Sequence, residues 1–331
     1  MEQHIDFLAI GDTVIDAFIR LNDAEIVTSK DGHTQLLGVR YGDKVPFESV
    51  EICNAVGNAA NAAVSAARLG LQSAILTYLG NDAHGTDCKN EFTKNGVSLD
   101  FVRTEDGKTT NYPYVLWYDV DRTILIKHEA FNYELGDIGS PKWIYLSSLG
   151  EHSAHMYEAI ASYLETHPEI KLAFQPGIFD IKQGTEKLSH IYSHAEAICM
   201  NVEEAQRVLN IQDRDLKVLL SGLAALGPKN VFITDGIDGA YAYSTAAPDT
   251  YWFMPIYPHA PFERTGAGDA FFSTVISALE LGKPINEALA WGPINSMSVV
   301  QFVGAQKGLL TEAKLSQYLA EAPADYQPRV I

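Results

Sequence analysis

Short apolar runs alternate with amphipathic helical patterns along most of this chain, and no other feature constrains its fold as strongly. We predict strands at residues 7–10, 74–79, 143–146, 172–174, 197–200 and 231–234. We predict helices at residues 57–69, 85–95, 154–166, 183–193, 203–226, 268–282, 286–303 and 311–320. Strands that alternate with helices indicate an α/β fold, in which helices cover the faces of a mostly parallel sheet.

Two stretches interrupt this alternation and predict a second, smaller sheet. Residues 14–46 contain alternating runs at 17–21 and 35–39 without helical periodicity. Residues 110–127 contain two runs, 112–118 and 123–127, joined by 119–122 in the manner of a β-hairpin. The two stretches are far apart in sequence and have few core residues of their own. We therefore expect one domain spanning residues 1–331, with a β lid formed from about 13–50 and 108–130.

The charge balance and the cysteines limit the classes of partner. The chain has 24 Lys and Arg against 42 Asp and Glu, a formal net charge of −18, and no dense basic run. Such a surface repels nucleic acid. We find no basic leader and no apolar stretch of about 20 residues, so no membrane partner is expected. Cys53, Cys88 and Cys199 are widely spaced, which favours free thiols and a cytoplasmic protein.

The motif Thr265-Gly266-Ala267-Gly268-Asp269 precedes an apolar helical pattern and is the strongest candidate for a chemical site. Glycines at a helix entrance let backbone N–H groups converge, and together with the positive helix end they form an anion site. A carboxylate beside it can accept the proton of a hydroxyl that attacks the bound anion. The alternative is an ordinary glycine turn with an acidic residue capping the helix.

Two further motifs follow predicted strands. Asn201 and Glu204 are three residues apart at a strand-to-helix junction, where they can either reach a hydrated Mg²⁺ or simply cap the helix. Thr234, Gly236 and Gly239 follow the next strand, where glycines allow a nucleotide to approach closely, unless they form a plain turn. In open α/β sheets, ligands bind outside the carboxyl ends of the strands.

The remaining candidates lie near the N-terminus. Gly57, Asn58 and Asn61 open the Ala-rich predicted helix, and Asn amides can bind vicinal hydroxyls. Asp12 and Asp16 follow the first strand, where they could also bind hydroxyls. The alternatives are a tightly packed helix start and a turn. The chain has neither a GxxxxGK[ST] motif nor a GxGxxG motif after its first strand, which disfavours P-loop proteins and dehydrogenases.

The order and spacing of these motifs resemble those of the PfkB, or ribokinase-like, family of sugar and nucleoside kinases. Residues 265–269 resemble the family signature D-T-x-G-A-G-D, and residues 56–61 are similar to G-G-x-x-A-N. Residues 201–204 resemble N-x-x-E, and residues 234–239 resemble T-x-G-x-x-G. The resemblance implies a three-layer α/β/α body with a mostly parallel sheet and a small β-sheet lid. It also implies transfer of the γ-phosphoryl of ATP to a hydroxymethyl group of a sugar.

The resemblance assigns roles by position in the matching motifs. Asp269 would be the catalytic base, and the N–H groups of Gly266, Ala267 and Gly268 would form the anion hole. The acceptor would be held by Asp12, Asp16, Gly57, Asn58 and Asn61. The nucleotide would be bound by Asn201, Thr234, Gly236, Gly239, Arg264 and Asn295. Asn201 and Glu204 would position Mg²⁺, and K⁺, which many members use, is a further candidate cofactor.

The sequence departs from the family pattern in ways that bear on the acceptor. Glu263 and Arg264 stand where the signature usually has Asp and a small residue, and Val56 replaces a common glycine. Gln175-Pro176-Gly177 stands where many sugar kinases have an Asp-Pro-Asn-like turn. A nucleoside kinase with an aromatic wall, and a non-catalytic ligand-binding homologue, therefore remain as alternatives. The alternating aromatic residues of the lid also suggest a homodimer.

The wall of a nucleoside kinase would come from aromatic residues of the lid region. The candidates are Tyr112, Tyr114 and Phe131.

Overall fold

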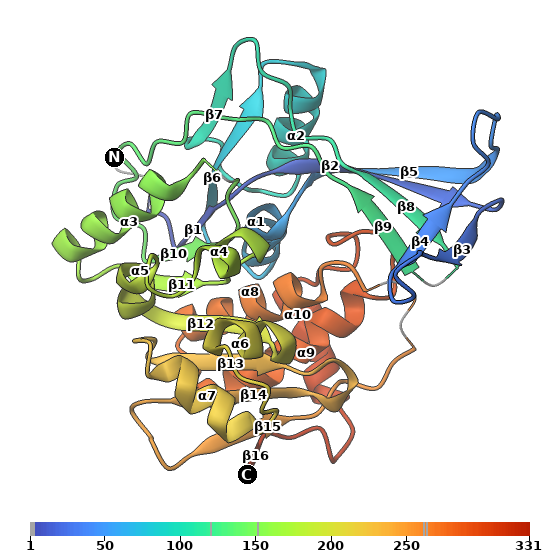
Figure 1. Cartoon of the computed structure of the whole chain (residues 1–331). Coiled ribbons are helices and arrows are strands. Elements are labelled where there is room, and N and C mark those ends of the chain that lie inside the picture. The colour runs from blue at the N-terminus through green and yellow to red at the C-terminus, as the bar shows by residue number, and fades with distance from the viewer. Residues whose placement is uncertain (1–3, 120, 151, 261, 263) are drawn as a thin grey trace.

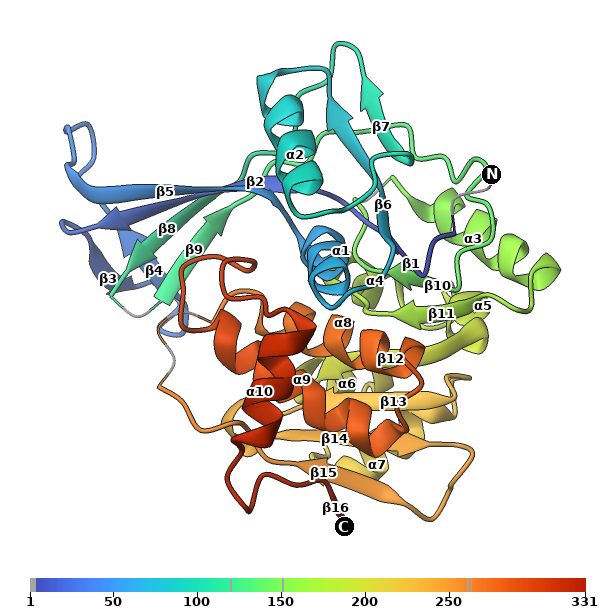
Figure 2. The same ribbon diagram turned by 180° about the vertical axis from the view of Figure 1, so that it is seen from behind.

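The computed structural model describes residues 4–119, 121–150, 152–260, 262 and 264–331. Within these residues the chain forms a ten-stranded sheet, a four-stranded sheet and a two-stranded sheet. Helices cover the two sides of the large sheet, and the four-stranded sheet projects from one edge of this body (Figures 1 and 2).

The large sheet has the order β16-β15-β14-β13-β12-β11-β10-β1-β6-β7. Its strands are β1 (Phe7–Ile10), β6 (Ser73–Gly80), β7 (Val102–Glu105), β10 (Trp143–Leu146), β11 (Lys171–Phe174), β12 (Ala195–Asn201), β13 (Asn230–Thr234), β14 (Ala240–Ser244), β15 (Tyr251–Met254) and β16 (Arg329–Val330). Pairing is parallel from β7 to β13 and antiparallel from β13 to β16. The central strands are apolar throughout because both of their faces are covered.

Two buried clusters lie on opposite faces of this sheet, as alternation along β1 shows. Phe7 and Ala9 belong to one cluster, and Leu8 and Ile10 to the other. The first cluster includes side chains of α1 (Asn58–Arg68), α2 (Ala83–Lys94), α8 (Ala267–Glu280), α9 (Ile285–Val299) and α10 (Glu312–Ala320). The second includes side chains of α3 (Ala154–Thr166), α5 (Ser189–His194), α6 (Val202–Leu209) and α7 (Leu216–Ala224). The predicted layered body is confirmed. None of the described helices is both long and apolar enough to cross a membrane.

Two predicted helices are broken in the structure, and the helix predicted at 286–303 ends at Val299 as α9. The helix predicted at 183–193 is replaced by α4 (Ile178–Gln183) and α5, separated at Gly184, which has a φ of 86°. The helix predicted at 203–226 is divided into α6 and α7, because Asn210 ends α6 in the left-handed conformation with a φ of 53°. Asp215 then caps α7 by accepting a hydrogen bond from the backbone N–H of Lys217.

The four-stranded sheet contains β2 (Val14–Leu21), β5 (Phe47–Val56), β8 (Tyr114–Tyr118) and β9 (Asp121–Leu125), in the order β5-β2-β8-β9. The predicted hairpin is confirmed as β8–β9, although residue 120 of its predicted turn lies outside the described residues. Two details of the prediction were wrong. The long strand β5 was missed, although its first residues fall within the predicted lid range of 13–50. The strands β3 (Glu25–Thr28) and β4 (Gln35–Gly38) form the separate two-stranded sheet.

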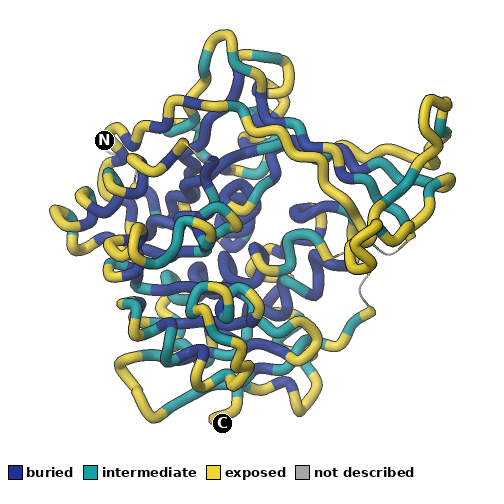
Figure 3. The backbone as a smooth tube through the Cα atoms, in the orientation of Figure 1, coloured by how far each residue is buried: buried dark blue, intermediate teal, exposed yellow. Residues whose placement is uncertain are grey.

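The two faces of the four-stranded sheet have different surroundings. Phe18 and Val115 are adjacent on one face and are buried. This face packs against the body, since Trp117 contacts Phe262 with ring centroids 5.7 Å apart. Figure 3 shows that much of the projecting sheet is exposed, and Tyr114 on the opposite face is 47% exposed. The sheet therefore covers the edge of the body where the parallel strands end.

Candidate functional site

Gly266 begins α8 in a conformation that glycine adopts easily. Its φ is 78°, and a methyl group at this position would overlap the backbone and side chain of Ala305. The turn therefore brings the chain close to the segment after α9 and exposes the first N–H groups of α8. Such groups have no partner within the helix, so they are suited to bind an anion.

Asp269 lies in the first turn of α8, and its side chain is turned inward. Its Oδ1 accepts hydrogen bonds from Asn58 Nδ2 (2.8 Å) and Gln175 Nε2 (3.2 Å), and its Oδ2 accepts one from Asn61 Nδ2 (2.8 Å). Burial raises the pKa of the Asp269 carboxyl, and the amide hydrogen bonds oppose that rise. The amides of α1 thus hold a buried carboxylate next to the glycine turn.

The start of α1 is also close to the end of β1. Gly57, the residue that caps α1, has a φ of 114°, and a Cβ there would lie 2.7 Å from the backbone oxygen of Asp12. The Asp12 side chain accepts a hydrogen bond from Tyr133 (2.8 Å), and His128 Nδ1 lies 3.9 Å away. Burial raises the pKa of Asp12 to about 6. Asp16 lies on β2, on the face that the sheet turns toward the body.

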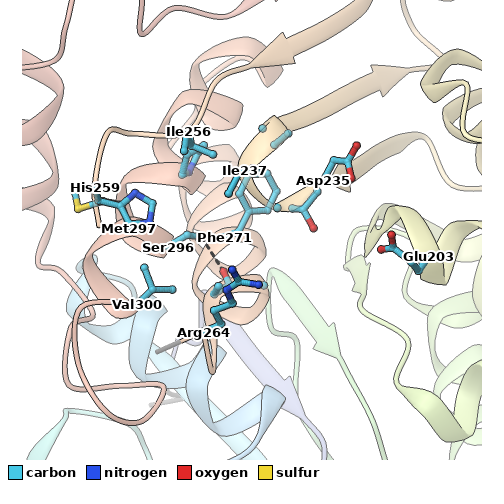
Figure 4. A pocket seen from close by; sticks show the side chains of 17 residues that line it. Glu203, Asp235, Ile237, Ile256, His259, Arg264, Phe271, Ser296, Met297 and Val300 are labelled. Carbon is cyan, nitrogen blue, oxygen red and sulfur yellow. Dashed lines mark hydrogen bonds between the residues drawn. The ribbon is translucent and has the colours of Figure 1, made fainter. Parts of the chain in front are cut away.

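A cavity of about 490 Å³ lies on the other side of the glycine turn. Residues from the start of α6, from the end of β13 and the turn after it, from the start of α8 and from α9 surround it (Figure 4). It is lined by Glu203, Thr234, Asp235, Gly236, Ile237, Gly239, Ala240, Ile256, His259, Arg264, Ala267, Gly268, Phe271, Pro293, Ser296, Met297 and Val300. Its apolar side chains suit a flat ring, whereas the glycine turn suits an anion.

Charges around this cavity are partly balanced. Glu203 and Asp235 line it, and both form ion pairs with Arg214, at 2.9 and 2.8 Å. Arg264 comes from the turn before α8, and its side chain lies in the cavity near Phe271 (Figure 4). An anionic ligand would therefore meet a guanidinium as well as backbone N–H groups.

Asn201 and Glu204 form a reciprocal cap at the start of α6. The backbone N–H of Asn201 donates to Glu204 Oε2 (2.9 Å), and the backbone N–H of Glu204 donates to Asn201 Oδ1 (2.8 Å). Asn201 and Glu204 therefore do cap the helix, but Glu204 Oε1 takes no part in the cap. Burial raises the pKa of Glu204, and the negative charge of Asp269 adds to the rise.

The donor set therefore fits a hydrated divalent cation, which would offset the repulsion between Glu204 and Asp269. Among the described residues, no cluster of three or more His, Cys, Asp or Glu side chains could hold a metal ion alone. Such a cation would need ligands from the nucleotide. The K⁺ prediction depends on residue 263, which lies outside the described residues.

The structure does not bring every predicted residue to the site. Asn295 is fully buried between helices, where it donates to Ser65 (3.3 Å) and Thr274 (2.7 Å) and accepts from Leu310 N–H. It is therefore not available to a nucleotide. The next residue, Ser296, lines the cavity instead. Neighbouring residues on a helix face different directions, and helical periodicity alone did not reveal which of the two residues faces the cavity.

The aromatic side chains expected to form a nucleoside wall lie elsewhere. Phe131 is buried in the core beside Tyr78, with ring centroids 6.2 Å apart. Tyr112 contacts His84 and Tyr114, and Tyr114 lies on the exposed face of the four-stranded sheet. Conversely, Gln175 contacts Asp269 although the sequence assigned it no role. The one sequence feature that pointed to Gln175 was its place in the Gln-Pro-Gly turn, which departs from the family pattern.

Comparisons with known proteins found a matching family and several relatives. The model of the pfkB family of carbohydrate kinases matches residues 41–312. The ribokinase of Bacillus subtilis (strain 168) is 27% identical over 272 residues, covering 80% of this chain and 87% of the relative. The fructoselysine 6-kinase of Escherichia coli (strain K12) is 25% identical over 251 residues, covering 75% of this chain and 90% of the relative.

Solved structures show the same fold. The ribokinase of Arabidopsis thaliana complexed with ribose and ATP superimposes with a TM-score of 0.78 at 18% identity, covering 96% of this chain and 99% of that one. The nucleoside kinase of Methanocaldococcus jannaschii gives a TM-score of 0.76 at 17% identity, with the same coverage. At these identities the likeness concerns the fold, and both sugar and nucleoside kinases share it.

Proposed function

The chain belongs to the pfkB family of carbohydrate kinases, and we propose that it transfers the γ-phosphoryl group of ATP to a hydroxymethyl group of an uncharged sugar. The observation that carries this proposal is the position of Asp269. It lies between the amides of α1 and the glycine turn that borders the cavity. A hydroxyl beside Asp269 would face a phosphoryl group held at that turn.

The reaction needs little covalent chemistry from the protein. The acceptor oxygen bonds to phosphorus, the bond from phosphorus to the ADP oxygen breaks, and the hydroxyl proton moves to Asp269. Phosphoryl transfer has a loose transition state, so positioning and charge stabilisation provide most of the catalysis. We assign the charge stabilisation to the N–H groups of residues 266–268 and to Arg264.

We assign the nucleotide to the cavity beside the glycine turn. Its apolar part would hold the base, and Thr234, Gly236 and Gly239 would lie along the ribose and phosphates. A hydrated Mg²⁺ on those phosphates would meet Glu204 and Asn201, and its chemistry is to neutralise phosphate charge. K⁺ stays a prediction.

The acceptor side favours an uncharged sugar. In the described part of the chain, the groups that contact the carboxylates of Asp12 and Asp269 are amides, hydroxyls and backbone N–H groups, with the His128 imidazole at 3.9 Å. Amides and carboxylates bind hydroxyl groups well, whereas a carboxylate or phosphate on the acceptor would be repelled. Asp12, Asp16, Gly57, Asn58 and Asn61 are the proposed acceptor residues.

Two coarser features complete the proposal. We propose that residues 1–331 work as one domain in which the four-stranded sheet is a lid that excludes water from the acceptor. We also propose a cytoplasmic location, which the buried free thiols of Cys88 and Cys199 support.

An ADP-release screen tests the proposed substrate class. The screen offers neutral pentoses and hexoses, sugar acids, sugar phosphates and nucleosides with ATP and Mg²⁺. We expect release above the acceptor-free background with a neutral sugar. Release with nucleosides alone would favour a nucleoside kinase. However, Phe131 and Tyr114 do not form the aromatic wall that a nucleoside base would require. No release with any acceptor would favour a non-catalytic homologue.

A further inference from the structure

The hydrogen bonds to Asp269 are distributed unequally over its two oxygens. Oδ1 accepts from both Asn58 and Gln175, whereas Oδ2 accepts from Asn61. Each carboxylate oxygen has about two lone-pair positions. Among the described contacts, Oδ1 is therefore saturated and Oδ2 has one position left for a further donor.

Gln175 reaches Asp269 from the large sheet. It directly follows β11, and its backbone N–H donates to Leu146 O (2.9 Å), which fixes the start of the side chain. Its Nε2 also lies next to the glycine turn, since a Cβ at Gly268 would be 3.7 Å from it. The amide thus fills the space between the end of the sheet and the first turn of α8.

Asp269 and Tyr145 together hold the amide of Gln175 in one orientation. The Tyr145 hydroxyl donates a hydrogen bond to Gln175 Oε1. A carboxylate can only accept, so the amide nitrogen must face Asp269 and the amide oxygen must face the hydroxyl. Tyr145 is fully buried, and its ring lies between Phe7 and Phe272, at centroid distances of 5.3 Å from each.

We propose that Gln175, oriented by Tyr145, positions the base of the reaction, so that Oδ2 of Asp269 is the atom that receives the acceptor proton. This inference rests on the proposed function, because it takes Asp269 as the base. Gln175 and Tyr145 are positioning residues, since they act through Asp269. As the acceptor oxygen bonds to phosphorus and the bond to ADP breaks, the hydroxyl proton moves to Oδ2.

The arrangement also affects protonation. An amide N–H stabilises the ionised carboxylate, so its loss raises the pKa of Asp269 further above its usual value. The Tyr145 hydroxyl donates to the amide oxygen and so holds that oxygen away from Asp269, where it would favour the protonated acid. The polar and titratable groups that face or influence Asp269 are Asn58 and Asn61 of α1, Gln175, Tyr145 of β10, Cys199 of β12 and Glu204 of α6.

The test measures kcat and both KM values across pH for Tyr145→Phe and Gln175→Met. At neutral pH we expect kcat to fall roughly 10-fold in Tyr145→Phe, because the amide of Gln175 loses the hydrogen bond that holds it. We expect a larger fall in Gln175→Met, because a hydrogen bond to a charged group is lost. The KM for ATP should not change. The acidic limb of the kcat profile should move to higher pH, with recovery at alkaline pH, which a merely structural defect would not produce.

Tyr326→Phe is the matched control. Tyr326 is buried in the same core cluster as Tyr145, and its hydroxyl donates to Ala290 O (2.7 Å). We expect this variant to lose stability and keep the wild-type pH profile. If Gln175→Met does not fold, Gln175→Glu replaces it. That variant keeps the size and the contact with Tyr145 but sets a second carboxylate against Oδ1, so its acidic limb should move furthest.

The outcomes separate this inference from the proposed function. The positioning role of Gln175 and Tyr145 would be overturned by one result. In that result the acidic limb of the kcat profile would lie at the wild-type pH in both Tyr145→Phe and the Gln175 variant. Asp269→Asn is measured alongside. Near-native activity in Asp269→Asn would overturn the proposed function itself, whereas an inactive Asp269→Asn with unshifted limbs would overturn only the role of Gln175 and Tyr145.

Discussion

Gly266 shows at the scale of one residue how backbone geometry limits substitution at the site. We expect Gly266→Ala to abolish phosphoryl transfer, because the new methyl group would overlap Ala305 and displace the N–H groups of the turn. Gly282→Ala is the control, since Gly282 has a similar φ of 81° but nothing within 4 Å of the added carbon. It should cost about 1 kcal/mol of stability and leave turnover unchanged. Turnover and thermal unfolding of both variants distinguish strain from loss of the anion site.

Glu204 has both a capping role and a proposed metal role, and one substitution separates them. Gln also completes this kind of cap, so Glu204→Gln should keep the fold while removing the charge. We expect the Mg²⁺ concentration at half-maximal rate to rise several-fold, about 3- to 10-fold, since one anionic contact is lost. Glu196→Gln, which loses a surface pair with Lys229, is the control. An unchanged Mg²⁺ titration in Glu204→Gln would leave only the capping role.

At the scale of the element, α4 carries a buried acid that couples stability to pH. Asp180 accepts hydrogen bonds from Tyr157 and from the backbone N–H of Gly177 (2.7 Å), and burial raises its pKa from 3.8 to about 6. The folded protein therefore binds this proton more tightly than the unfolded chain. This contribution to stability is complete below pH 3.8 and is lost as pH rises through about 6.

Asp180→Asn tests that coupling. The substitution removes the ionisation, so the slope of unfolding free energy against pH in this window should become shallower, by up to about 1.4 kcal/mol per pH unit. Burial also raises the pKa of Asp12 to about 6, so Asp12 adds to the same pH dependence of stability. The Asp180→Asn variant should therefore retain the part of the slope that comes from Asp12. Denaturant unfolding at several pH values measures the slope, with exposed Asp249→Asn as the control. Equal slopes in Asp180→Asn and the wild type would contradict the prediction.

The elements that sequence could predict are those whose residues are buried on a regular period. The strands of the parallel core were predicted because alternate residues pack into the same buried cluster. Most helices were predicted because residues one turn apart do so. β5 was missed because much of it is exposed, so its alternation is weak. The Gln175 contact could not be predicted either, because it joins the end of β11 to α8 across 94 positions.

At the scale of the whole molecule, one face of the four-stranded sheet is apolar and uncovered. Ile52, Ala17, Tyr114 and Leu125 form one row across its four strands, and Val50 belongs to the next. Except for Ala17, these side chains are between 47% and 55% exposed. Such a face invites pairing, and we propose that a second copy of the chain covers it.

Light scattering tests this pairing. We expect the wild type to have twice the mass of one chain and Ile52→Asp to have the mass of a single chain. Leu281→Asp, at an exposed apolar residue at the far end of α8, should stay dimeric. A wild-type protein with the mass of a single chain at micromolar concentration would contradict the proposed dimer.

The most direct measurement is the turnover of Asp269→Asn with the best acceptor from the screen, together with its affinity for ATP by calorimetry. We expect turnover to fall about 10²- to 10⁴-fold, because the proton acceptor is lost, while the affinity for ATP stays near that of the wild type. Turnover close to the wild-type value would show that this carboxylate is not the base and would contradict the assignment of the whole site.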